Sequence, residues 1–85
     1  MNKIREYQYY LCINKKGSSL IEIIGLADLK IYKSLGYMPI KAADNMDEAT
    51  GFVIEIISKY LGFYTDFCVI KFREWVIENA QKAVK

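Results

Sequence analysis

The sequence predicts a small, mainly helical α+β fold that forms a single domain over residues 1–85. Three observations lead to this prediction. An N-terminal stretch alternates with a period of two, as half-buried strands do, and later stretches repeat apolar residues with the period of a helix. Hydrophobic residues make up 53% of the chain and the net charge is only +2, which excludes a disordered chain. The predicted order is strand, helix, short extended edge, helix and helix, with three β–α units as the second choice.

The first predicted element is a strand over Tyr7 to Asn14. One face of this strand carries Tyr7, Tyr9, Leu11 and Ile13, and the other carries Gln8, Tyr10, Cys12 and Asn14. Residues 15–18, with the sequence KKGS, are a turn signal that ends it.

A helix is predicted from Leu20 to Leu35. At about 100° per residue its apolar side chains gather on one side, namely Leu20, Ile23, Ile24, Ala27, Ile31 and Leu35. Ser19 and Glu22 have the spacing of a capping box, and Gly36 stands where a left-handed residue ends a helix. The alternative is that residues 19–26 form the return strand of a hairpin. Its weakness is that the adjacent Ile23 and Ile24 would point to opposite faces.

The next stretch, Tyr37 to Ala42, contains Pro39 and is therefore expected to be an edge strand or an extended link. A second helix is predicted from Met46 to Leu61, with Asp44 or Asn45 as its N-cap and Gly62 as its stop. Its apolar face holds Met46, Ala49, Val53, Ile57, Tyr60 and Leu61.

A third helix is predicted within residues 63–85, capped by Thr65 or Asp66. Its apolar stripe is Val69, Phe72, Val76, Ala80 and Ala83. Because Phe67 to Ile70 is apolar on all sides, a short buried strand over residues 67–72 is the alternative.

The sequence favours no catalytic, metal or cofactor site, and we expect the protein not to be an enzyme. The chain has no histidine, the commonest general base and metal ligand. The densest acidic group, Asp44, Asp47 and Glu48, lacks the spacing of a calcium loop and is better explained by helix capping. The five glycines are isolated, so no phosphate-binding loop and no small-molecule substrate is indicated.

Compartment and membrane signals are equally sparse. No uninterrupted apolar run approaches the roughly 18–20 residues that span a bilayer. The first eight residues carry Lys3, Arg5 and Glu6 and lack the apolar core of a secretory signal. Cys12 and Cys68 lie far apart in the sequence and are interpreted as two buried thiols. A cytoplasmic protein without membrane contact is therefore expected.

Nucleic-acid binding is the alternative function. Tyr10 points away from the predicted core face, and Arg5, Lys15 and Lys16 flank its strand. Exposed aromatic rings stack on bases and cations neutralise phosphates. A net charge of +2 argues against this hypothesis, so nucleic acid is the less favoured partner.

The favoured hypothesis concerns apolar residues that fall on the wet sides of the predicted helices. These residues are Leu26, Leu29, Phe52 and, if helical, Phe67. Large apolar side chains outside the core are typical of interaction surfaces. The sequence therefore predicts a non-enzymatic protein–protein interaction or regulatory module, most simply a twofold homodimer.

Overall fold

The computed structural model describes residues 7–16 and 20–83, and it confirms the α+β class. Its elements in chain order are β1 (Tyr9–Asn14), β2 (Glu22–Gly25), a short 3-10 helix (Leu26–Asp28), α1 (Leu29–Ser34), β3 (Tyr37–Ala43), α2 (Met46–Phe63) and α3 (Val69–Ala83). The three strands form one antiparallel sheet in the order β2-β1-β3, so β1 is central.

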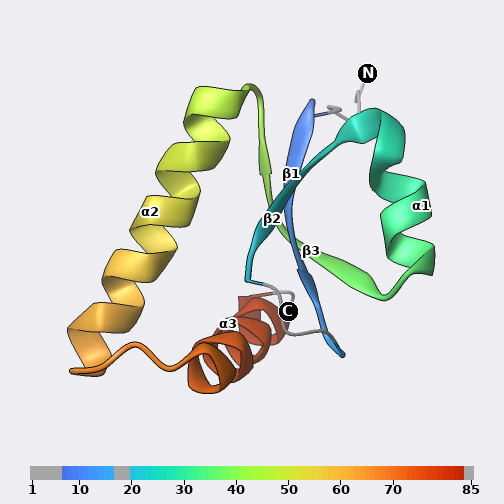
Figure 1. The fold of residues 1–85 in the computed structure, drawn as a ribbon. Helices are drawn as coiled ribbons and strands as arrows, with labels where there is room; N and C mark the ends of the chain where they lie inside the picture. Colours follow the sequence, from blue (N-terminus) through green and yellow to red (C-terminus); the bar gives the residue numbers. More distant parts are fainter. Residues whose placement is uncertain (1–6, 17–19, 84–85) are drawn as a thin grey trace.

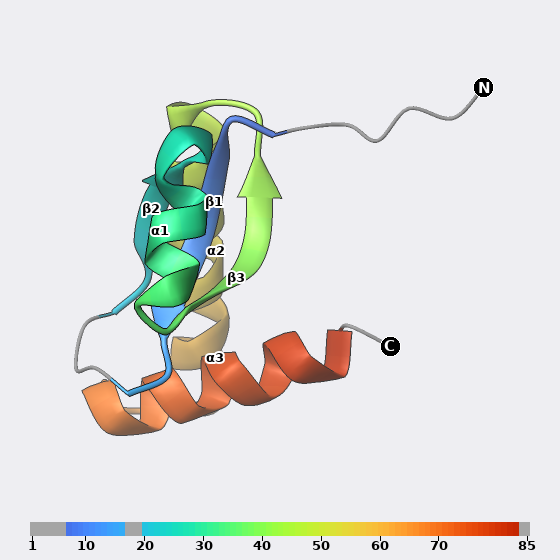
Figure 2. The ribbon, with the colours of Figure 1, turned by 90° about the vertical axis from the view of Figure 1, so that its right-hand side faces the viewer.

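Helices lie on both faces of this sheet. Figure 1 shows α2 on one side of the strands and α1 on the other, and Figure 2 shows α3 crossing below the end of the sheet. The predicted alternation of β1 is confirmed, since Leu11 and Ile13 belong to the two apolar clusters that α2 helps to form. Cys12 faces the other way and is also fully buried.

The predicted helix from Leu20 to Leu35 is wrong in its first half, and the hairpin alternative is correct. Residues Glu22–Gly25 form β2, which pairs with β1 so that Ile24 lies opposite Tyr10. Ile23 packs on the side of α2, whereas Ile24 is buried on the opposite face. A strand that is covered on both faces loses its apolar–polar alternation, and this explains the misleading pattern.

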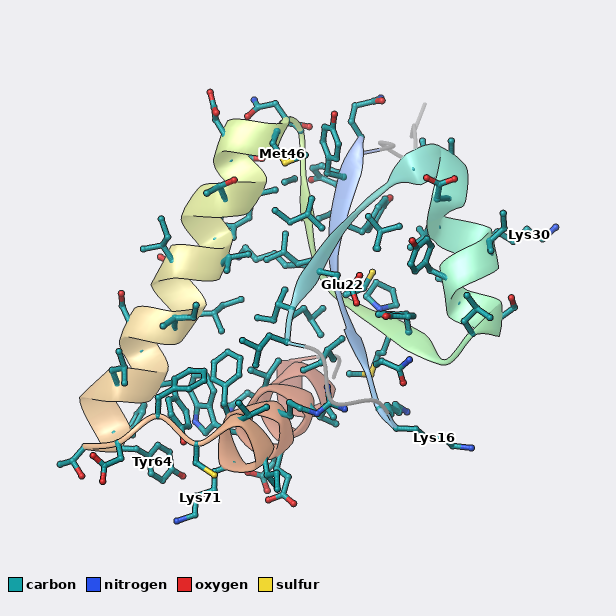
Figure 3. The ribbon with its side chains drawn as sticks, in the orientation of Figure 1. Lys16, Glu22, Lys30, Met46, Tyr64 and Lys71 are labelled. Carbon is teal, nitrogen blue, oxygen red and sulfur yellow. The ribbon has the colours of Figure 1, made fainter. Side chains whose placement is uncertain are left out.

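The predicted capping role of Glu22 is wrong for the same reason. The Glu22 carboxylate Oε2 accepts a hydrogen bond of 2.5 Å from the Tyr37 hydroxyl, which joins β2 to β3 across the central strand. Figure 3 shows Glu22 on the sheet, on the side of α1. Ser19, the other member of the predicted box, lies outside the described residues. Gly36 has a φ of 98°, which confirms the left-handed residue expected after α1.

The start of α2 is confirmed and its end is corrected. The Asn45 side chain accepts a hydrogen bond of 2.8 Å from the Glu48 backbone N–H, as an N-cap does. The helix does not stop at Gly62 but continues to Phe63. Its last turn is held because the Tyr64 N–H donates to the Tyr60 carbonyl, and the two rings stack 4.7 Å apart.

The third helix is confirmed as α3, and the strand alternative for residues 67–72 is wrong. The Phe72 N–H already makes a helical bond of 2.8 Å to the Cys68 carbonyl. Phe72 and Val76 are buried in a cluster with Ile13 and Tyr60, and a second cluster holds Leu11, Ala43 and Ala49. The edge position predicted for β3, with Pro39 inside it, is also confirmed.

Candidate interaction surface

Phe52 does not lie on the wet side of α2, where the sequence placed it. Its half-buried ring packs against the cluster of Leu11, Ala43 and Ala49. The Lys41 ammonium lies 4.4 Å from the ring centroid, a cation–π contact. The prediction was wrong because α2 lies across a sheet face, and this broad contact buries a wider sector than a narrow helical stripe.

The other predicted interface residues have mixed positions. Leu26 and Leu29 are half-buried, because α1 begins only at Leu29 and does not continue the phase of the predicted helix. Phe67 is 41% exposed, with its ring edge against Tyr60. Whether these side chains contact a partner remains a prediction.

Six large apolar residues assigned to core faces are exposed instead, and they are Leu20, Ile31, Leu35, Met46, Leu61 and Val69. In α1 the reason is length, since six residues form less than two turns and none of them is buried. In α2, Met46 is the first residue of the helix, and Leu61 lies about 100° around the helix axis from Tyr60, which is buried against the sheet.

Most of the exposed large apolar side chains belong to the stretch of sequence from the middle of α2 to the first turn of α3. We call them the α2–α3 apolar surface, and they are Ile54, Leu61, Phe63, Tyr64, Phe67, Val69 and Ile70. Every residue from 61 to 71 is exposed, and Phe63 reaches 75%. Figure 3 shows Tyr64 and Lys71 at this end of the molecule. Sequence analysis found only Phe67 among these residues.

An aromatic group beneath this surface fixes its shape. The fully buried ring of Tyr60 has four aromatic neighbours at centroid distances of 4.7–5.6 Å, namely Tyr64, Phe67, Phe72 and Trp75. Tyr64 and Phe67 thus have one side against the core and the other toward solvent. The turn between the helices is therefore a packed feature that presents its apolar side chains at fixed positions.

Two hollows adjoin α3. The first, of about 220 Å³, lies between β3, α2 and α3 and is lined by Ile40, Lys41, Ile56, Lys59, Trp75, Val76 and Asn79. It is smaller than the roughly 300–1,000 Å³ of ordinary ligand pockets. The second, of about 340 Å³, is lined by Tyr64, Lys71, Glu74, Trp75 and Glu78. Within the described residues, no group of three or more potential ligands could hold a metal ion.

The two cysteines differ in their environment. Both are free thiols, and Cys12 is fully buried in the sheet as predicted. The predicted burial of Cys68 is wrong, because this residue lies in the exposed turn just before α3. Burial raises the pKa of Cys12 from its ordinary 9.0 to about 11; Lys33 opposes this shift and Glu22 adds to it. At neutral pH the Cys12 thiol is therefore protonated and poorly nucleophilic.

We expect one thiol per folded chain to react with Ellman's reagent at pH 8, and two in denaturant.

The folded protein binds the Cys12 proton more tightly than the unfolded chain does. This tighter proton binding contributes to the free energy of unfolding. The contribution is fully present below pH 9 and is lost as the pH rises toward about 11. Urea titrations at pH 8 and pH 10.5 measure this loss, and Cys12→Ala is expected to reduce it. Rapid reaction of both thiols in the folded protein would contradict the placement of Cys12.

The residues of the nucleic-acid alternative are not brought together. Tyr10 is half-buried near the start of β1, whereas Lys15 and Lys16 are exposed just beyond its other end. Five residues of strand separate Tyr10 from Lys15 by about 17 Å. Arg5 lies outside the described residues.

Comparisons with known proteins give no information on function. No family model matches the chain, and neither a curated protein nor a solved structure matches it. In the part of the chain that the structure describes, no helix combines the length and the apolar character needed to cross a bilayer.

Proposed function

We propose that this protein is a non-enzymatic interaction module that associates with itself through the α2–α3 apolar surface. One observation carries the proposal: seven large apolar side chains are exposed between Ile54 and Ile70, on a packed part of the structure. Exposed apolar patches that are contiguous and rimmed by polar groups are typical of protein–protein contacts.

The energetics favour association. Full burial of a large apolar side chain stabilises by about 1.5–3 kcal/mol relative to its exposure to water. Association costs about 4–15 kcal/mol in lost translational and rotational freedom. Several side chains of this surface must therefore be buried together, and a twofold dimer achieves this because each residue contributes twice.

The proposal is tested by sedimentation velocity over a concentration series. We expect Ile54→Glu to weaken association while leaving the circular dichroism spectrum unchanged, because the side chain is 60% exposed. The matched control is Ile31→Glu on α1, where the isoleucine is also 60% exposed but lies on the other side of the sheet. Ile70→Glu is the corresponding substitution at the α3 end of the same surface, and its association is measured in the same way.

The control is expected to associate like the unmodified chain. A chain that stays monomeric at every concentration would overturn the proposal. Equal effects of Ile31→Glu and the two variants of the α2–α3 apolar surface would overturn it as well, since association would then depend on charge and not on this surface.

A further inference from the structure

The outer side of α2 alternates between large and small residues. At about 100° per residue, Gly51, Ile54, Ser58 and Leu61 fall within a sector of about 80°, opposite the buried Ala49 and Tyr60. All four are exposed, and Figure 1 shows no other element on this side of the helix. The sector therefore has no partner within the described chain.

The order of sizes along this sector is self-complementary. If a second α2 lies antiparallel, with the twofold axis between Ile54 and Ser58, Leu61 of each copy faces Gly51 of the other. In the same register Ile54 faces Ser58. Large residues thus meet small ones at these four positions, which is the arrangement that lets facing helices interdigitate. A twofold contact requires such self-complementarity, whereas an unrelated partner does not.

Gly51 has no role that packing within the chain explains. A Cβ built on Gly51 meets nothing within 4 Å, so alanine or a larger residue would fit. Glycine inside a helix is less stable than alanine by about 1 kcal/mol. A leucine approaching from a second copy would use the space that glycine leaves open.

The charges beside this sector also match. Glu55 and Lys59 are exposed on the same flank of α2. Antiparallel helices place equivalent flanks together, so Glu55 of one copy lies near Lys59 of the other, and twofold symmetry forms the pair twice. A parallel arrangement brings unlike flanks together and does not form these pairs.

We propose that two copies of the chain pack α2 against α2 in antiparallel orientation, with Leu61 opposite Gly51. This inference rests on the proposed function and names its partner as a second copy in a defined register. The remaining side chains of the α2–α3 apolar surface then flank the helix contact at both of its ends.

A size swap tests the register. Gly51→Leu places leucine opposite leucine and is expected to weaken dimerisation by about tenfold or more, although it fits the isolated helix. Leu61→Ala removes the large partner and is also expected to weaken it. The double variant Gly51→Leu with Leu61→Ala restores large against small and is expected to recover affinity to within about threefold of the unmodified chain.

A spin-label distance tests the orientation independently. The label is placed at Asp47→Cys in a chain that also carries Cys68→Ser, while buried Cys12 stays unlabelled. In the proposed register the twofold axis passes through α2 at position 56, nine residues after Asp47, so the two labels are about 27 Å apart along the helix axis. Parallel helices would place them within roughly 10–15 Å.

The outcomes separate this inference from the proposed function. Recovery in the double variant together with the long distance supports the antiparallel dimer. Association that Ile54→Glu or Ile70→Glu weakens, but without recovery in the double variant or with a short distance, overturns the inference alone. Absence of association in the unmodified chain overturns both.

Discussion

Replacing Phe72 by alanine is expected to lower the free energy of unfolding by about 3–5 kcal/mol. Phe72 is fully buried between the end of the sheet and the C-terminal half of α2, in one cluster with Ile13, Tyr60 and Val76. Its ring meets the Tyr60 ring edge-on at 5.2 Å. Alanine removes these contacts and leaves a cavity where α3 docks.

Urea denaturation followed by the fluorescence of Trp75 measures this effect. The matched control is Ile70→Ala, two residues earlier in α3, where the side chain is 68% exposed. A surface substitution of this kind is expected to change stability by no more than about 0.5 kcal/mol. If Ile70→Ala proved as costly as Phe72→Ala, the phase of α3 on the sheet would be wrong.

Arg73→Ala is expected to cost about 1.5–3 kcal/mol, the usual contribution of a hydrogen bond from a charged group. Arg73 is only 7% exposed, and its guanidinium Nη2 donates to the backbone carbonyl oxygen of Asn14. This bond joins α3 to the last residue of the central strand. Its loss leaves that carbonyl without this donor and removes the packed stem of the arginine.

Two substitutions serve as controls for the arginine. Arg73→Lys keeps a positive charge and is expected to lose part of the stability, since it replaces the planar fork by a single ammonium. Lys71→Ala removes an exposed cation from the same helix and is expected to change stability by no more than about 0.5 kcal/mol. Equal losses for Lys71→Ala and Arg73→Ala would show that Arg73 acts only through net charge.

Local signals were sufficient to predict most of the elements. The faces of β1, the edge position of β3 and the start of α2 at Asn45 depend on nearest neighbours in sequence, and all three are confirmed. The pattern of β2 favours a helix because the adjacent Ile23 and Ile24 are covered on opposite faces of the sheet. That burial depends on α1 and α2 together, and periodicity in a short segment cannot distinguish it from a buried helix.

The candidate surface was harder to predict because exposure depends on which side of each helix meets the sheet. Phe52 lies on the side of α2 that packs on the sheet and is half-buried, whereas Leu61 lies on the outer side and is exposed. The available signal was the apolar stretch from Leu61 to Ile70, which lies between two helices and follows no single helical phase. Arg73 gave no sequence signal, since its partner is a backbone carbonyl 59 residues away.

The most direct test of the central claim is the mass of the unmodified chain in solution, measured by sedimentation equilibrium over a wide concentration range. We expect a reversible dimer with twice the 9.9 kDa of one chain, whose stability changes little with salt because apolar contacts dominate. A constant mass of 9.9 kDa at all concentrations would contradict the claim that the α2–α3 apolar surface serves self-association.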